Sequence, residues 1–235
     1  MNTNKAEIIR EVTKIILRNA KPNRIFLYGS EASGESKAGS DIDIAFDDEN
    51  KPDIYLIKEE IEKLSTLVKI DVINLKNADK RFVERVKSTG KVLYSSTKEL
   101  RAEDGLYNFS NSLKKFIEVV DGEDIFKEKG FYDVYLDILV KRFEFTYEMA
   151  WKALKRYLEF LGIEAKAPRT VFKEAFSQEI IREEDVWLDM IEQRNLTSHI
   201  YDEFQIKDLL NKKENYKNAF IQLKEKIESD ISAVN

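Results

Sequence analysis

The spacing of apolar residues changes character near the middle of the chain. In the first part, short apolar runs separate amphipathic stretches, a pattern that predicts strands alternating with helices. The expected strands lie at 24–28, 41–46, 68–75 and 91–94, and the expected helices at 5–20, 53–66 and 77–89. Strands and helices that interleave at this spacing indicate a small α/β domain with a mixed sheet.

From about residue 98 onward, apolar residues recur at steps of three and four, as on one face of a helix. The clearest series is Phe143, Tyr147, Trp151, Leu154, Leu158 and Leu161. The segment 131–161 is apolar on more than one face, which is typical of the central helix of a bundle. Further helices are predicted at 103–120, 168–177, 183–199 and 205–231. The polar stretch 95–105 marks the boundary, so we expect an α/β domain over 1–97 and an all-α helical bundle over 98–235.

The composition narrows the classes of function. With 43% hydrophobic residues in 235, the chain can fill a core, and its lack of cysteine excludes disulfides and thiolate metal sites. No apolar run is long enough to cross a membrane, and the N-terminus is amphipathic, so we expect a cytoplasmic protein. The net charge of −5 lacks the basic surplus of a bulk nucleic-acid binder. We therefore expect no DNA partner, and any RNA contact would be local.

One stretch, YGSEASGESKAGSDIDIAF at 28–46, carries candidate chemistry. Gly29 and Ser30 follow a strand, where a glycine lets the backbone approach a phosphate and the serine offers a hydroxyl and an N–H. Asp41 and Asp43 are two residues apart on a predicted strand and so project to one face. Asp71 interrupts another strand that could pair alongside. Three carboxylates beside a phosphate cradle suit two Mg²⁺ ions and phosphoryl or nucleotidyl transfer.

These residues resemble the motif of a minimal nucleotidyltransferase of the DNA polymerase β superfamily. Gly29-Ser30, a ten-residue gap and Asp41-Ile42-Asp43 match it, with Asp71 as the third carboxylate. The resemblance implies ATP as the nucleotide donor and Mg²⁺ at the three aspartates. The family often has Ala-Arg-Gly after the Gly-Ser, whereas this chain has Ala32-Ser33-Gly34. The missing arginine removes a contact to phosphate or substrate.

A second signal surrounds the single histidine, in IEQRNLTSHIYDE at 191–203. Asn195 and His199 are four residues apart and share a helix face. Arg194 and His199 are five apart, about 140° around an ideal helix, so they converge only if the arginine curls around or the helix ends. By itself this pattern also fits a structural histidine at a helix end.

The surroundings resemble a HEPN domain of the subgroup described as nucleotidyltransferase substrate-binding proteins. The segments 143–163 and 167–176 carry the resemblance together with Arg194, His199 and Tyr201, and it covers most of 103–231. It implies a metal-independent ribonuclease site, with His199 as general acid or base and Arg194 stabilising phosphate charge. It also implies a homodimer that supplies a second histidine.

The two resemblances together describe a nucleotidyltransferase and a HEPN domain fused in one chain, like a toxin–antitoxin pair in which the nucleotidyltransferase attaches AMP to the motif tyrosine. We expect transfer of AMP from ATP to a hydroxyl, with Tyr201 as the acceptor. Two alternatives stay open. One is transfer to a small hydroxyl compound, as in aminoglycoside nucleotidyltransferases, and the other is a nucleotide-binding protein without turnover.

Overall fold

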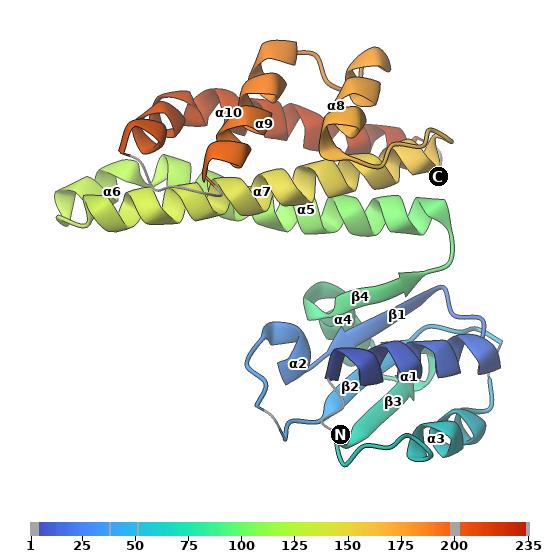
Figure 1. Ribbon diagram of the computed structural model, residues 1–235. Coiled ribbons are helices and arrows are strands. Elements are labelled where there is room, and N and C mark those ends of the chain that lie inside the picture. Colours follow the sequence, from blue (N-terminus) through green and yellow to red (C-terminus); the bar gives the residue numbers. More distant parts are fainter. Residues whose placement is uncertain (1–4, 38, 51, 198–202, 234–235) are drawn as a thin grey trace. The chain divides into compact units, whose positions relative to one another are not determined.

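The computed structural model describes residues 5–37, 39–50, 52–197 and 203–233, which form two compact units, 1–100 and 101–235 (Figure 1). The first unit is a small mixed sheet with helices, and the second is helical throughout its described part, which confirms the predicted fold class. None of the described helices combines the length and apolar character needed to span a membrane.

The first unit contains a four-stranded sheet in the order β3-β2-β1-β4. Its elements are α1 (Lys5–Asn19), β1 (Arg24–Tyr28), α2 (Ser30–Ser33), β2 (Ile42–Phe46), α3 (Ile54–Glu62), β3 (Ile70–Asn74), the 3₁₀ turn η1 (Leu75–Asn77), α4 (Lys80–Thr89) and β4 (Lys91–Ser95). β1 pairs antiparallel with β2 and with β4, whereas β2 and β3 are parallel. The sheet is therefore mixed, as the sequence predicts.

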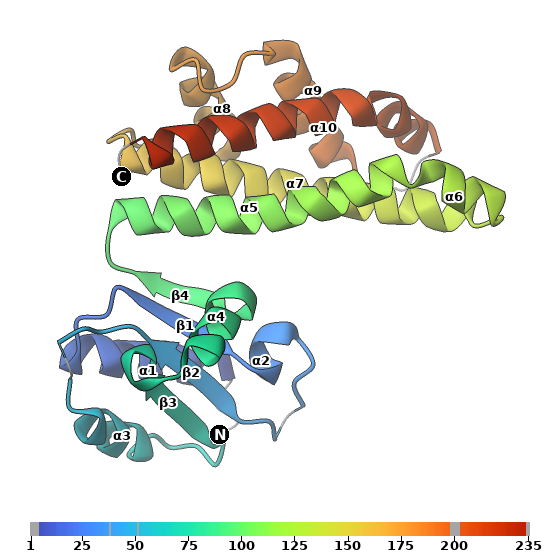
Figure 2. The same ribbon diagram turned by 180° about the vertical axis from the view of Figure 1, so that it is seen from behind.

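Helices cover both faces of this sheet (Figures 1 and 2). Alternate β2 residues Ile42, Ile44 and Phe46 point into a core shared with α1 and α3. Ala45, on the opposite face of the same strand, packs with Val86 of α4. Because side chains alternate along a strand, Asp43 lies on the α4 face together with Ala45.

Two helices of this unit, α3 and α4, begin at aspartates that cap them. The Asp53 side chain accepts a hydrogen bond from Tyr55 N at the start of α3, and Asp79 accepts one from Phe82 N at the start of α4. An N-cap carboxylate satisfies a backbone N–H that has no partner within the helix. The predicted helix at 77–89 therefore starts three residues later, and the predicted helix at 53–66 ends earlier, at Glu62.

The second unit is a bundle of helices. They are α5 (Lys98–Asp121), α6 (Glu123–Glu128), α7 (Tyr132–Phe160), α8 (Pro168–Ser177), α9 (Glu184–Thr197) and α10 (Glu203–Ser232). α5, α7 and α10 run side by side along its length, and α8 and α9 pack against α7 (Figures 1 and 2). The short α6 is absent from the prediction. α5 begins shortly after β4 ends, so the polar stretch 95–105 is largely helical.

Aromatic side chains fill the centre of the bundle. Phe220 of α10 is fully buried, with ring centroids 5.9 Å from Phe109 and Phe116 of α5 and 5.8 Å from Trp187 of α9. Such edge-to-face pairs add to the free energy gained by burying the rings. On α5, a Cβ at Gly105 would lie 3.1 Å from Ala153 Cα of α7, so the glycine permits close approach of the two helices.

Candidate functional site

Two of the predicted carboxylates are brought together by the strand register. Asp43 of β2 is paired with Asp71 of β3 in the parallel ladder, and with Tyr28 of β1 in the antiparallel one. Paired residues carry their side chains on the same face of a sheet. Asp43 therefore lies between an aspartate on the edge strand β3 and the tyrosine that precedes Gly29.

Asp41 precedes β2 and is linked to the other carboxylates through Lys69. Lys69 Nζ lies 2.6 Å from Asp71 Oδ2 and 3.6 Å from Asp41 Oδ2. The lysine side chain is 66% exposed, so it can leave this position at little cost in free energy. The ammonium marks the space between Asp41 and Asp71 as one that attracts a cation.

The electrostatics of Asp43 reflect the concentration of negative charge. Burial raises the pKa of its carboxyl, and the nearby Asp71 and Asp41 raise it further, while Lys69 acts in the opposite direction. Burial also raises the pKa of the Tyr28 hydroxyl, with further contributions from Asp43 and Asp71. Both shifts reflect burial combined with the negative charge that is concentrated on this face of the sheet.

Gly29 lies directly against Asp43. A Cβ added at residue 29 would come within 2.4 Å of Asp43 Oδ2, and the backbone φ of 71° is one that other residues rarely adopt. Ser30 follows as the first residue of α2. The glycine thus places the Gly-Ser backbone next to the carboxylates, as the sequence motif predicts.

The donor set fits a hard cation, although the side chains are not closed around one. Within the described residues, no three His, Cys, Asp or Glu side chains are gathered as a metal-binding group. Asp71 is turned to Lys69 instead. The available ligands are carboxylate oxygens, the ligand type that Mg²⁺ prefers. Displacing one exposed ion pair would free Asp71 for a metal.

Two cavities border the carboxylates within the first unit. One, of about 350 Å³, is lined by Tyr28, Gly29, Ser33, Arg85, Val86 and Thr89. The other, of about 460 Å³, is lined by α3 and β3 residues that include Lys69 and Asp71. Both volumes are in the range of small-molecule sites, roughly 300–1,000 Å³.

In the second unit, Arg194 of α9 is paired with a carboxylate. Its Nε and NH2 groups donate to Glu148 Oε1 of α7 at 3.2 and 3.1 Å. Glu148 Oε2 also accepts from Trp151 Nε1 at 3.0 Å. Burial alone would raise the pKa of Glu148, but the hydrogen bonds from Trp151, Arg194 and Lys152 lower it overall. The predicted phosphate ligand thus links α9 to α7.

His199 and Tyr201 lie outside the described residues. The predicted helix at 183–199 is described as α9 up to Thr197, and its last two predicted residues lie outside the described part of the chain. Arg194 and Asn195 are both on this helix, and Asn195 is exposed. The proposed roles of His199 and Tyr201 therefore stay predictions.

Three charged residues of these sites were not found by sequence reasoning. Lys69 stands two residues before Asp71, and this spacing on one strand was a usable signal, because such residues share a face. Arg85 and Glu148 gave no such signal. Each becomes relevant only through contacts with residues far away in the sequence.

Comparisons with known proteins match two families to different parts of the chain. Residues 10–99 match the family described as "Polymerase beta, Nucleotidyltransferase", and residues 104–230 match "Nucleotidyltransferase substrate binding protein like". A Methanocaldococcus jannaschii protein named "Putative protein adenylyltransferase MJ1379" is 37% identical over 83 residues, which are 34% of this chain and 83% of that protein.

Two solved structures are also similar over 51% of this chain. One, from Thermus thermophilus, is 27% identical with a TM-score of 0.44, and 98% of that chain is covered. The other, a toxin–antitoxin with AMP-PNP, is 22% identical with a TM-score of 0.33, and 95% of that chain is covered.

The first unit is thus a nucleotidyltransferase domain of the polymerase β class, with its Gly-Ser turn and carboxylates on one side of a mixed sheet. The second unit matches its own family over more than half of the chain. The chain belongs to the nucleotidyltransferase substrate binding protein-like family, and it carries the nucleotidyltransferase domain in the same polypeptide.

Proposed function

We propose that this protein transfers AMP from ATP to a hydroxyl acceptor and requires Mg²⁺. The observation that carries the proposal is the pairing of Asp43 with Asp71 across β2 and β3, with Gly29 against Asp43. Carboxylates from two strands thereby meet a backbone position that a phosphate can approach. The name of the archaeal relative supports AMP as the transferred group and a protein as the acceptor.

Asp41, Asp43 and Asp71 are the residues that would hold the metal. Their oxygens are suitable ligands, and the position of Lys69 indicates that a cation is attracted between Asp41 and Asp71. When bound, Mg²⁺ would neutralise phosphate charge and lower the pKa of the acceptor hydroxyl. Without a cation, a triphosphate would meet three negatively charged side chains.

The reaction is a displacement at the α-phosphorus of ATP. The acceptor hydroxyl oxygen forms a bond to that phosphorus, and the bond from phosphorus to the α,β-bridging oxygen breaks. Pyrophosphate leaves with the electron pair, and the hydroxyl proton passes to solvent. Gly29 and Ser30 would orient the phosphates by backbone and hydroxyl contacts. The acceptor hydroxyl can then approach the α-phosphorus from the side opposite the leaving pyrophosphate.

We propose Tyr201 of the helical unit as the acceptor, on the strength of the HEPN resemblance. A tyrosine hydroxyl has an ordinary pKa near 10, so its deprotonation needs help from the site. The alternative acceptor is a small hydroxyl compound. The two differ in the product: an AMP adduct on the protein, or none until a small acceptor is added.

Intact mass spectrometry after incubation with ATP and Mg²⁺ tests the transfer, and peptide mapping locates the adduct. We expect one AMP on the wild type, none on Asp43→Asn and none on Tyr201→Phe. An adduct that persists in Tyr201→Phe would contradict the tyrosine assignment. The absence of an adduct, combined with labelling of an added small hydroxyl compound, would favour the alternative.

Mixing the two variants distinguishes transfer within a chain from transfer between chains. Asp43→Asn retains the acceptor, and Tyr201→Phe retains the carboxylates. An AMP adduct on the Asp43→Asn chain in the mixture would mean transfer between chains. The proposed homodimer, formed through the helical surface around 194–201, predicts a dimer mass in light scattering at micromolar concentration, and a monomer mass would contradict it.

The ribonuclease activity implied by the HEPN resemblance stays a separate proposal, with RNA as its partner. Arg194 gives it no direct support, because its guanidinium is bonded to Glu148. An RNA phosphate would have to compete with that carboxylate. The geometry therefore favours nucleotidyl transfer as the first function to test.

A further inference from the structure

The cavity beside Gly29 poses an electrostatic problem for a nucleotide. Its lining residue Gly29 lies against Asp43, and Asp43 is paired with Asp71, so negative charge is concentrated beside the cavity. A triphosphate brings several more negative charges. Metal ions at the carboxylates offset charge near the α-phosphate, but the remaining phosphates extend beyond them and need a cation of their own.

Among the residues that line this cavity, Arg85 of α4 is the one with a positive charge. Its guanidinium carbon lies 5.2 Å from the centroid of the Phe82 ring, and that ring packs edge-to-face on Tyr28 at 5.4 Å. Phe82 and Tyr28 thus hold the arginine head near the end of β1. Over the described part of the chain, no hydrogen bond or ion pair engages this guanidinium. Its donors are available to a ligand.

Ser33 lines the same cavity. It stands where the motif of the resembling family often has an arginine, and its hydroxyl is directed to Ser30 O at 3.2 Å and Glu35 Oε2 at 3.4 Å. Ser33 therefore contributes no positive charge to the cavity. The missing charge is supplied from a different element, since Arg85 comes from α4 on the other side of the same space.

We propose that Arg85 binds the β- and γ-phosphates of the nucleoside triphosphate in the cavity that it shares with Gly29 and Ser33. Arg85 would thereby replace the phosphate-binding arginine that the Gly-Ser motif of this chain lacks. The proposal rests on the proposed nucleotidyl transfer and adds a specific triphosphate ligand to it. Arginine suits this role because its planar donors bind phosphate oxygens in pairs.

The rate of AMP adduct formation on the full chain tests the proposal, with kcat/KM for ATP taken as the initial slope of that single-turnover rate against ATP concentration. We expect Arg85→Ala to lower kcat/KM for ATP by roughly 10- to 100-fold, the range of a hydrogen bond between charged groups. Arg85→Lys should recover part of the loss. The decisive variant is Ser33→Arg in the Arg85→Ala background. It should restore activity, because the new arginine on α2 places a positive charge in the same cavity.

Lys87→Ala is the matched control. Lys87 is another exposed cation of α4, but it does not line the cavity, so its removal changes the net charge equally and should leave kcat/KM within twofold. Arg85→Ala within twofold of the wild type would overturn the proposal. Loss of activity in Lys87→Ala equal to that in Arg85→Ala would also overturn it, because the effect would then be one of overall charge.

Equilibrium binding separates this proposal from the proposed function. ATP and adenosine should respond differently when each is titrated into the Tyr201→Phe chain, which lacks the proposed acceptor: adding Arg85→Ala should weaken ATP binding and leave adenosine binding unchanged. Equal weakening of both would overturn the proposal, since the cavity would then hold the base. If the wild type transfers no AMP, the nucleotidyl-transfer proposal fails, and the comparison of ATP with adenosine still decides the role of Arg85.

Discussion

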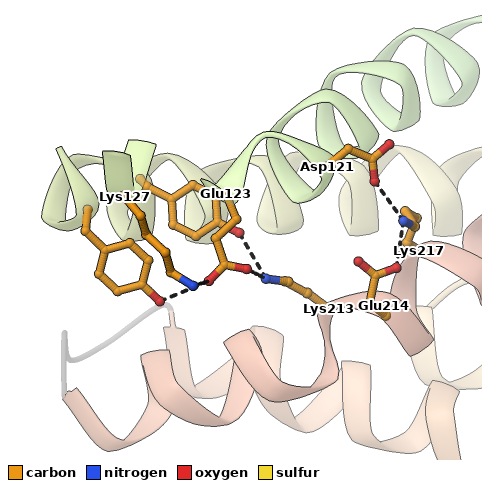
Figure 3. A network of polar contacts seen from close by, with 8 residues as sticks. Asp121, Glu123, Lys127, Lys213, Glu214 and Lys217 are labelled. Atoms are coloured by element: carbon orange, nitrogen blue, oxygen red, sulfur yellow. Dashed lines mark hydrogen bonds and ion pairs between the residues drawn. The ribbon is translucent and has the colours of Figure 1, made fainter. Parts of the chain in front are cut away.

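Replacing Glu123 by glutamine should destabilise the helical unit. Glu123 begins α6 and accepts from Lys213 of α10, from Lys127 at 2.8 Å and from the Tyr132 hydroxyl at 3.2 Å (Figure 3). The Lys213 side chain is 10% exposed, and that of Glu123 is 19% exposed. The substitution would leave the buried Lys213 ammonium without an opposite charge at residue 123, facing only neutral acceptors there and at the Tyr135 hydroxyl.

The magnitude follows from the pKa of Glu123. Burial by itself would raise this pKa, but hydrogen bonds from Lys127 and Lys213 outweigh it and lower the pKa from 4.5 to about 2. A shift of this size corresponds to about 3 kcal/mol of stability at neutral pH. Because the group is partly reached by solvent, we expect a loss of about 2 kcal/mol in Glu123→Gln.

The sign of the pH dependence follows from the lowered pKa. The stabilisation is complete above the unfolded-state value of about 4.5, and it is lost as the pH falls towards about 2. The free energy of unfolding of the wild type should therefore approach that of Glu123→Gln across this window. Urea unfolding at pH 7 and at pH 3 measures both quantities. Tryptophan fluorescence reports on this unit alone, since Trp151 and Trp187 both lie in it.

Asp121→Asn is the matched control, because Asp121 bonds Lys217 across the neighbouring helices in the same network (Figure 3). Asp121 is 57% exposed, so its loss should cost less than about 1 kcal/mol. The reasoning is refuted if Glu123→Gln costs no more than Asp121→Asn. It is also refuted if the difference between wild type and Glu123→Gln is as large at pH 3 as at pH 7.

Three further predictions concern the two candidate sites. Asp43→Asn should abolish AMP transfer without lowering the melting temperature, since it removes a charge repelled by its neighbours; activity near wild type would contradict the metal assignment. Gly29→Ala should lower transfer by roughly 5- to 150-fold, because backbone strain and the clash with Asp43 cost roughly 1–3 kcal/mol; unchanged kinetics would refute the close packing. Glu148→Gln and Arg194→Ala should both lower the unfolding free energy of the helical unit, because each breaks the ion pair between α9 and α7; an effect of Arg194→Ala alone would contradict a stabilising role of this ion pair.

Much of the fold could be predicted from the sequence because the apolar spacing is regular. The strand 24–28 was predicted to the residue, and the long helix 131–161 differs from α7 by one residue at each end. The centre of the strand is buried, and so is most of the predicted apolar series of the helix, although Leu161 at the end of that series is exposed. α6 was missed because its six residues are too short to show a helical period.

The candidate site was predictable only in its local part. The Gly-Ser motif, Asp41 and Asp43 all lie within residues 29–43, so their spacing along the chain carries the information. The pairing of Asp43 with Asp71 needs the parallel register of β2 and β3, which no local pattern specifies. Arg85 was not recognised, because surface arginines are common and nothing in its spacing from the motif distinguishes it.

The environment of Arg194 bears on the proposed contact between this residue and an AMP phosphate on Tyr201. Glu148 has partners besides Arg194, since Trp151 donates to its Oε2 and Lys152 Nζ lies 3.3 Å from that same oxygen. If an AMP phosphate on Tyr201 drew Arg194 away, Glu148 would keep a hydrogen bond and an opposite charge. The cost of leaving a carboxylate unpaired would thus be largely avoided. The same exchange would loosen α9 from α7, so the proposed modification would change both charge and packing at the end of α9.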